Sequence, residues 1–139
     1  LPLRTHRHVR NASPLARWLD SRPGVSRVRH PEIPTNGYSH LVKKYLPLGA
    51  GAVFCFDLDG GRTAGQEFIR GVKLFSHLAN VGDAKSLIIH PASTTHRQLS
   101  DEELTAAGIG PGTIRISVGI EDISDLQWDL EQAFDRLSA

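Results

Sequence analysis

The stretch that decides the fold is Thr113-Ile-Arg-Ile-Ser-Val-Gly-Ile-Glu-Asp122. Apolar and polar residues alternate along it with a period of two, which predicts a strand with one apolar face and one polar face. The apolar positions are Ile114, Ile116 and Val118, and the polar positions are Thr113, Arg115 and Ser117. The apolar face is therefore expected in a core, with Arg115 on the opposite face.

A helix is predicted directly after this strand. Gly119 ends the strand, and the residues after Asp122 repeat apolar side chains at spacings of three and four, as on one face of a helix. These residues are Ile123, Leu126, Leu130, Phe134 and Leu137. Asp122 suits the N-cap position, and Asp125 adds an acidic first turn that favours the helix dipole.

Arg115 is the one candidate binding residue that the pattern itself suggests. A guanidinium on a strand whose other face is buried is held firmly, and it can bind a carboxylate through two parallel hydrogen bonds. An ordinary surface arginine on a half-exposed sheet is the alternative. The spacing alone leaves both interpretations open.

Composition indicates one globular domain. The chain has 139 residues, of which 40% are hydrophobic and 22% are charged, and no apolar run reaches the ~20 residues of a membrane span. It starts with Leu1 and contains no Met, so we expect a processed product or a piece of a longer protein. Cys55 is the only cysteine, which excludes an internal disulfide and predicts a small core residue in a reducing, cytoplasmic setting.

Charge is unevenly distributed along the chain. Nine of the 16 Lys and Arg residues lie within 1–45, where Asp20 and Glu32 are the only acids. Few aromatic residues lie among these cations, so we expect no nucleic-acid partner and instead a basic face that docks on an acidic protein surface.

The predicted elements mix strands and helices without strict alternation. Strands are expected at 25–30, 52–58, 76–80, 86–90 and 113–118, and helices at 3–21, 41–46, 63–75, 100–107 and 123–137. They predict an α/β fold of the α+β type, with a small antiparallel or mixed sheet of four to five strands and helices packed on one side. Pro14 is expected to kink the first helix or to split it, with Ser13 as a new N-cap.

Two helix starts show the pattern of a capping box. Thr63 with Gln66 and Ser100 with Glu103 have the required spacing. The glycine-rich segment 108–112 precedes a strand, so it is interpreted as a connection rather than as a phosphate-binding loop.

Metal and nucleophile motifs are absent from the sequence. None of the seven histidines forms a tight set with a carboxylate or cysteine, and Asp57-x-Asp59 lacks the later ligands of a calcium loop. His90 and His96 are expected to hold the intervening segment through backbone hydrogen bonds. No metal site and no catalytic nucleophile or base are predicted.

Two long motifs carry a resemblance to a known family. Ser86-Leu-Ile-Ile-His-Pro-Ala-Ser-Thr-Thr-His96 and the stretch 113–122 resemble the C-terminal domain of the pyridoxal-phosphate-dependent enzymes of Cys/Met metabolism. Several further stretches resemble the O-acetylhomoserine sulfhydrylase branch: Leu1-Pro-Leu-Arg4, Tyr45-Leu-Pro47, Leu78-Ala-Asn-Val-Gly-Asp-Ala-Lys-Ser86 and Leu99-Ser-Asp-Glu-Glu-Leu104. The match covers essentially the whole chain.

The resemblance implies a fold, a site and a reaction. Residues 1–139 would be the C-terminal domain of a longer enzyme of fold type I, with 1–21 as a remnant of the interdomain helix. Arg115 would bind the α-carboxylate of the amino-acid substrate, with Asn80 as a second contact. The parent enzyme would convert O-acetylhomoserine and sulfide to homocysteine and acetate in methionine biosynthesis.

The resemblance also implies what lies outside this chain. The pyridoxal 5'-phosphate, its Schiff-base lysine and its phosphate ligands would belong to an N-terminal domain, so we expect no bound cofactor and no activity for residues 1–139 alone. The intact enzyme would be a homo-oligomer, a tetramer by resemblance. Alternatives are a cystathionine γ-synthase, cystathionine γ-lyase or methionine γ-lyase of the same family, or a stand-alone small-molecule-binding or oligomerisation domain.

Overall fold

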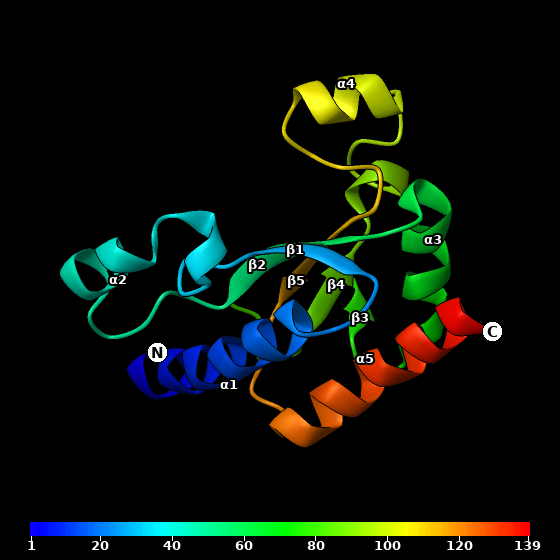
Figure 1. The fold of residues 1–139 in the computed structure, drawn as a ribbon. Helices are drawn as coiled ribbons and strands as arrows, with labels where there is room; N and C mark the ends of the chain where they lie inside the picture. Colours follow the sequence, from blue (N-terminus) through cyan, green and yellow to red (C-terminus); the bar gives the residue numbers. More distant parts are fainter.

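The structure, a computed structural model, describes residues 1–139. In chain order its elements are α1 (Pro2–Asp20), β1 (Val25–Arg29), η1 (Pro34–Asn36), α2 (Ser39–Tyr45), β2 (Val53–Leu58), α3 (Gly61–Gly71), β3 (Ser76–His77), β4 (Leu87–Ile89), η2 (Pro91–Ser93), α4 (Asp101–Ala106), β5 (Thr113–Ser117) and α5 (Ile123–Ser138). All five predicted strands are present, and Figure 1 shows them as one sheet with helices arranged around it.

The sheet is mixed, with the order β1-β2-β5-β4-β3. Only the β3–β4 pair is parallel, and the other three pairs are antiparallel. The strand β5 lies at the centre, so Arg115 has Cys55 of β2 on one side and Ile89 of β4 on the other. This architecture confirms the predicted fold class.

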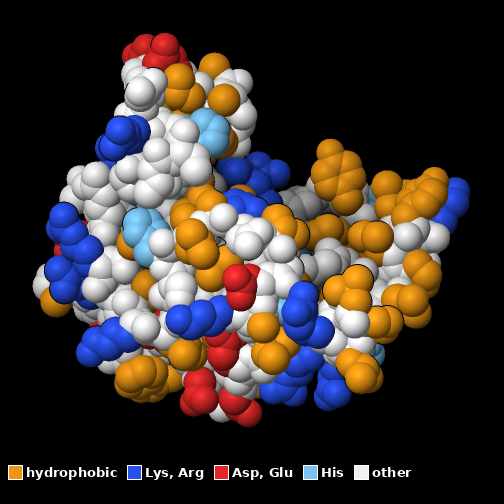
Figure 2. Space-filling view, turned by 180° about the vertical axis from the view of Figure 1, so that it is seen from behind, with side chains coloured by type: hydrophobic (Ala, Val, Ile, Leu, Met, Phe, Trp, Pro, Cys, Tyr) orange, Lys and Arg blue, Asp and Glu red, His pale blue; other side chains and the backbone are white.

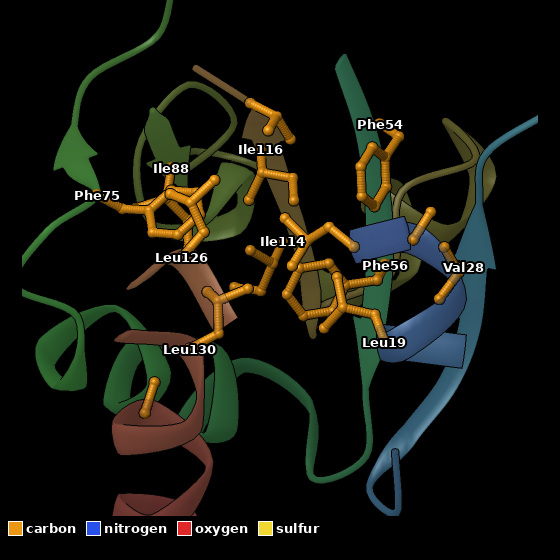
Figure 3. Close-up of a cluster of buried hydrophobic side chains, with 14 of the residues drawn as sticks. Leu19, Val28, Phe54, Phe56, Phe75, Ile88, Ile114, Ile116, Leu126 and Leu130 are labelled. Atoms are coloured by element: carbon orange, nitrogen blue, oxygen red, sulfur yellow. The ribbon is translucent and has the colours of Figure 1, made fainter. Parts of the chain in front are cut away.

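One face of the sheet carries the hydrophobic core. The apolar side chains of β5 belong to one core cluster with those of α1, α3 and α5. Figure 3 shows Ile114 and Ile116 among residues of α1, α5 and the neighbouring strands. The fully buried members include Leu15, Leu19, Phe56, Phe68, Ile88, Leu126 and Leu130. Burial of one such side chain contributes about 1.5–3 kcal/mol, so this face fixes the register of β5.

The first helix is continuous through Pro14, so the structure contains one helix here and not two. Pro14 lies on the exposed side of α1, where water can hydrate the carbonyl group of Arg10 that loses its partner. Ala12, Leu15, Ala16 and Leu19 hold the other side in the core. Tertiary packing therefore outweighs the local cost of the proline.

The helix α3 differs from its prediction at both ends. It begins at Gly61, with Gly60 as N-cap at φ 93°, and no side-chain cap forms, so the predicted Thr63–Gln66 capping box is wrong. It ends at Gly71 rather than at residue 75. Because Gly60 adopts a positive φ, the chain turns sharply after β2 and the helix begins two residues earlier than predicted.

Other helix starts follow the sequence more closely. The Ser100–Glu103 capping box of α4 is confirmed, and Asp122 caps α5 by accepting a hydrogen bond from the amide of Ser124 at 2.9 Å. The short helix α2 begins at Ser39, but its N-cap is Tyr38 and no side chain caps it. None of the helices combines the length and the apolar character needed to cross a membrane.

Candidate substrate-carboxylate site

The candidate site lies on the face of the sheet opposite the core. Alternate residues of β1, β2 and β5 point to this face: Arg29, Cys55, Asp57, Thr113 and Arg115. Arg29 Nη2 forms an ion pair with Asp57 Oδ2 at 2.8 Å. The hydroxyl group of Thr113 donates to Asp57 and accepts a hydrogen bond from the amide of Gly110. These contacts join three strands and give the site a fixed floor.

This face is less exposed than the alternating pattern suggests. Thr113 and Ser117 are as buried as the core residues, with exposed fractions of 2% and 3%, and only Arg115 between them is half-buried. Ala79 of the loop after β3 and Pro91 and Thr95 of the segment after β4 line a cavity together with residues of β5. Arg115 is therefore the one β5 side chain of this face that a ligand can reach.

The guanidinium group of Arg115 has no acidic partner. Six ion pairs are present in the chain, and Arg115 takes part in none of them. Its only hydrogen bond is a long one, from Nη2 to the backbone carbonyl oxygen of Asn80 at 3.5 Å. Most of its five donors are left for a planar anion.

Arg115 lines a cavity of about 300 Å³. The other lining residues are Arg29, Cys55, Ala79, Ile89, Pro91, Thr95, His96, Ile109 and Thr113. Apolar and polar side chains share this lining, and Arg115 is its only arginine without an acidic partner. Such an unpaired cation can orient a small ligand by one polar group. A ligand of this cavity is expected to be small and to carry a carboxylate.

The segment 91–99 that borders the cavity is anchored by His90. His90 Nε2 lies 2.7 Å from the carbonyl oxygen of Pro111, and Nδ1 lies 2.8 Å from the hydroxyl oxygen of Ser93. Burial lowers the pKa of His90. The predicted anchoring role of His90 is confirmed, whereas the imidazole ring of His96 bonds only the side chain of its neighbour Thr95.

A second anchor of this segment comes from α3. The guanidinium group of Arg62 donates to the carbonyl oxygens of Ala92 and Leu99, and it forms an ion pair with Asp101 at 2.7 Å. The segment thereby keeps its place beside Arg115, although it contains only a single 3-10 turn.

Asn80 contacts Arg115 through its backbone and not through its side chain. Its side-chain oxygen accepts a hydrogen bond from the amide of Val81 at 2.8 Å, so the polar group that the sequence suggested as a ligand is turned onto its own loop. The carbonyl oxygen of Asn80 is the atom that meets the guanidinium group.

Cys55 is not a core residue, and that prediction is wrong. It lies half-buried on the cavity face, because Phe54 and Phe56 take the core positions of β2. Burial raises the pKa of the Cys55 thiol, and the nearby charges of Arg29 and Arg115 oppose this only in part. The thiol is therefore protonated at neutral pH and is a weak nucleophile.

The residues of this chain do not fit a Schiff-base site for pyridoxal phosphate. All four lysines, Lys43, Lys44, Lys73 and Lys85, are exposed, and none lines the cavity at Arg115. No group of three or more His, Cys, Asp or Glu residues gathers in the geometry of a metal site. What the chain offers is an arginine without an acidic partner on a rigid sheet.

Residues 1–135 match the family described as Cys/Met metabolism PLP-dependent enzymes. The chain belongs to this family. The O-acetyl-L-homoserine sulfhydrylase 1 of Thermus thermophilus is 48% identical over 133 residues, which cover 96% of this chain and 32% of that protein. The homocysteine synthase of Schizosaccharomyces pombe is 47% identical, with 97% and 32% covered. The chain thus spans about a third of the length of the curated relatives it matches.

A solved structure shares the fold of this chain, and the chain again covers about a third of it. The crystal structure of the putative O-acetylhomoserine (thiol)-lyase of Campylobacter jejuni superposes with a TM-score of 0.87 at 42% identity, over 96% of this chain and 32% of that chain. It contains N'-pyridoxyl-lysine-5'-monophosphate. In that relative, therefore, the cofactor is attached to a lysine.

Sequence reasoning found Arg115 and missed the residues that share its cavity. Arg29, Cys55 and Ile89 come from three other strands that are far apart in the chain, and only the strand order brings them together. The period-two pattern places each residue on a face of its own strand, but it does not show which strands are neighbours.

Proposed function

We propose that this chain is the substrate-carboxylate-binding domain of an O-acetylhomoserine sulfhydrylase, which converts O-acetylhomoserine and sulfide to homocysteine and acetate. The unpaired guanidinium group of Arg115, half-buried in a cavity of about 300 Å³, is the observation that carries the proposal. The names of relatives at 46–48% identity support the choice of reaction.

Arg115 binds the α-carboxylate of the amino-acid substrate in this proposal. A hydrogen bond to a charged group contributes about 1.5–3 kcal/mol, and the planar fork makes two of them in parallel. Because β5 is held in the centre of the sheet, the guanidinium group fixes the orientation of the substrate as well as its affinity. The carbonyl oxygen of Asn80 limits the freedom of the guanidinium group, while the substrate carboxylate takes its remaining donors.

The rest of the active site comes from a part of the enzyme outside these residues. When bound, pyridoxal 5'-phosphate supplies the electron sink for chemistry at the substrate α-carbon. We propose that residues 1–139 form the C-terminal domain, that α1 belongs to the interdomain helix, and that the cofactor domain lies N-terminal to it. Relatives about three times as long as this chain support that arrangement.

The cofactor domain has a surface on which to dock. Large hydrophobic side chains are exposed on the α2 arm (residues 33–51), at the start of α1 and on the loop 78–81: Leu1, Leu3, Tyr38, Leu41, Tyr45, Leu46, Leu48, Leu78 and Val81. Figure 2 shows hydrophobic side chains gathered on the arm, which projects from the rest of the molecule. Exposed apolar area of this extent is typical of an interface.

The same surface would also serve a homo-oligomer, for which we propose the tetramer of the family. The single free thiol of Cys55 fits a reducing compartment, the cytoplasm.

The test is turnover by the full-length gene product that contains this chain. We expect homocysteine from O-acetylhomoserine and sulfide, and no turnover by residues 1–139 alone. A product that forms only with cysteine in place of sulfide would identify a γ-synthase, and elimination without a sulfur acceptor would identify a γ-lyase. Binding without any turnover by the full-length protein would identify a binding module and would overturn the proposal.

The role of Arg115 is tested in the same protein. We expect Arg115→Gln to raise KM for the amino acid roughly 10- to 100-fold, which corresponds to the loss of one or two charge-assisted hydrogen bonds. Arg27→Gln is the matched control, because Arg27 is an exposed, unpaired arginine on the same face of the sheet. An unchanged KM in Arg115→Gln would remove Arg115 from the site.

A further inference from the structure

The turn 119–121 after β5 is bound directly to the start of β4. The carboxylate group of Glu121 accepts a hydrogen bond from the amide of Ser86 at 2.8 Å and another from its hydroxyl group at 2.7 Å. The hydroxyl oxygen of Ser86 in turn accepts a hydrogen bond from the amide of Gly119 at 2.7 Å. Ser86 is fully buried, so these bonds have no substitute from water. We call Glu121 and Ser86 the clamp.

The turn 119–121 packs closely against residues 84–86. A Cβ atom on Gly119 would lie 2.4 Å from the carbonyl oxygen of Ala84 and 2.6 Å from the amide nitrogen of Ser86, so only glycine fits there. The amide of Ile120 donates to the carbonyl oxygen of Ala84 at 3.0 Å. From the other side, Asn11 of α1 donates to the carbonyl oxygens of Gly119 and Glu121. The turn is thus a rigid support against which segment 84–86 is held.

The loop 78–86 between β3 and β4 depends on this support. Its outer residues 78–82 are exposed, and the side chains of Asn80 and Asp83 bond only amides of the loop itself. Beyond the clamp, two side-chain hydrogen bonds tie the loop to other elements, from Arg4 to the carbonyl oxygen of Gly82 and from Arg115 to that of Asn80. The amides of Ile120 and Ser76 also donate to the carbonyl oxygens of Ala84 and Ser86. The clamp therefore holds the end of the loop that carries the Asn80 carbonyl group.

We propose that Glu121 is a positioning residue for substrate binding at Arg115. It fixes the loop 78–86 through Ser86, and the loop presents the carbonyl oxygen of Asn80 that orients the guanidinium group of Arg115. Glu121 makes no contact with the substrate. This inference rests on the proposed function of Arg115 and adds the residue that holds it in the binding orientation.

Loss of the clamp has a specific kinetic consequence. Without the Glu121 carboxylate, the amide and hydroxyl groups of Ser86 lose their acceptors and the loop 78–86 moves more freely. Arg115 then loses its one fixed partner and samples several rotamers, so the substrate carboxylate binds less tightly. A substrate already bound still lies against the same guanidinium group, so KM rises while kcat stays nearly constant.

The test compares variants of the full-length enzyme. We expect Glu121→Ala to raise KM for the amino acid roughly tenfold, the factor for one well-formed hydrogen bond, with kcat within about twofold of wild type. Glu121→Gln keeps one acceptor for the amide of Ser86 and recovers most of the loss. Asp122→Ala is the control, because Asp122 directly follows the turn and its carboxylate group bonds only Ser124 of α5.

A double variant separates positioning from general destabilisation. In an Arg115→Lys background, where the fork is absent, Glu121→Ala should add almost no further rise in KM, because the two residues act through one group. Additive effects, or an equal rise in the Asp122→Ala control, would overturn the proposal.

A readout independent of turnover keeps the two proposals distinct. In the full-length protein, hydrogen exchange at the amides of Ser86 and residues 80–82 should accelerate roughly tenfold in Glu121→Ala and remain unchanged in Asp122→Ala. Unchanged exchange in Glu121→Ala overturns the clamp whatever the enzyme does. A wild-type protein without turnover overturns the sulfhydrylase proposal, and the exchange rates then decide on the clamp alone.

Discussion

Gly71 of α3 lies directly against Ala133 of α5. A Cβ atom on Gly71 would be 2.6 Å from the Cα atom of Ala133 and 3.1 Å from its Cβ atom, so the two helices meet at their backbones. Gly71 lowers the intrinsic stability of α3, but it permits this approach and thereby lets Phe68 and Phe134 stack edge to face at 4.9 Å.

Gly71→Ala is expected to destabilise the fold. Helix propensity alone would favour alanine by about 1 kcal/mol, but the added methyl group must push α5 away from α3, and overpacking of this kind costs about 1–3 kcal/mol. Urea denaturation measures the difference in the free energy of unfolding. Thr63→Ala is the control, since Thr63 is an exposed residue of the same helix with no side-chain contact. Destabilisation of both variants to the same extent would contradict the explanation.

Asp129 is expected to be the most sensitive polar residue of the fold. Its fully buried carboxylate group accepts hydrogen bonds from three consecutive amides, those of Lys73, Leu74 and Phe75, at 2.7, 2.8 and 3.0 Å. Asp129→Asn keeps the shape but brings two donors to a site that needs acceptors, so at least one buried amide is left unpaired.

The expected loss in Asp129→Asn is about 3 kcal/mol, the upper end of the cost of an unsatisfied buried group. Chemical denaturation of the two proteins gives the value. Asp135→Asn, an exposed residue on the same helix, should change stability by less than about 0.5 kcal/mol. A loss below 1 kcal/mol in Asp129→Asn would show that water or a shifted loop replaces the carboxylate.

The same contact explains where sequence reasoning failed on α3. The apolar spacing of Phe68, Val72 and Phe75 predicts a helix to residue 75, and Gly71 is the only local residue that disfavours this continuation. The chain leaves the helix at Gly71 because a carboxylate on α5, more than 50 residues away in sequence, takes the next amides. Long-range capping of this kind has no local sequence signal, whereas the local caps of Asp122 and Ser100 were predictable.

The candidate site was also predictable only in part. The period of two placed Arg115 on the correct face of β5, and the motif resemblance predicted a carboxylate group as its ligand. The position of Asn80 beside it was also predictable by resemblance, but not that its backbone carbonyl, rather than its side chain, makes the contact. Cys55 was misplaced because Phe54 and Phe56 compete for the core face, and a run of apolar residues does not reveal which alternate set is buried.

Acidification is expected to destabilise the fold through two buried histidines. Burial is the main cause that lowers the pKa values of His30 and His90 below the usual 6.5. The unfolded chain therefore binds protons near pH 6.5 that the folded chain takes up only at lower pH, so the free energy of unfolding falls as the pH drops from about 7 to 5. The carboxyl groups with lowered pKa values, Glu67 and Asp122, titrate below this window.

We expect His90→Gln to be less stable at pH 7.5 but to show a shallower pH dependence, whereas His40→Gln, at an exposed position in α2, should keep the wild-type slope. Urea denaturation at half-unit pH steps measures this, and a wild-type stability that stays constant or rises on acidification would contradict neutral, buried histidines.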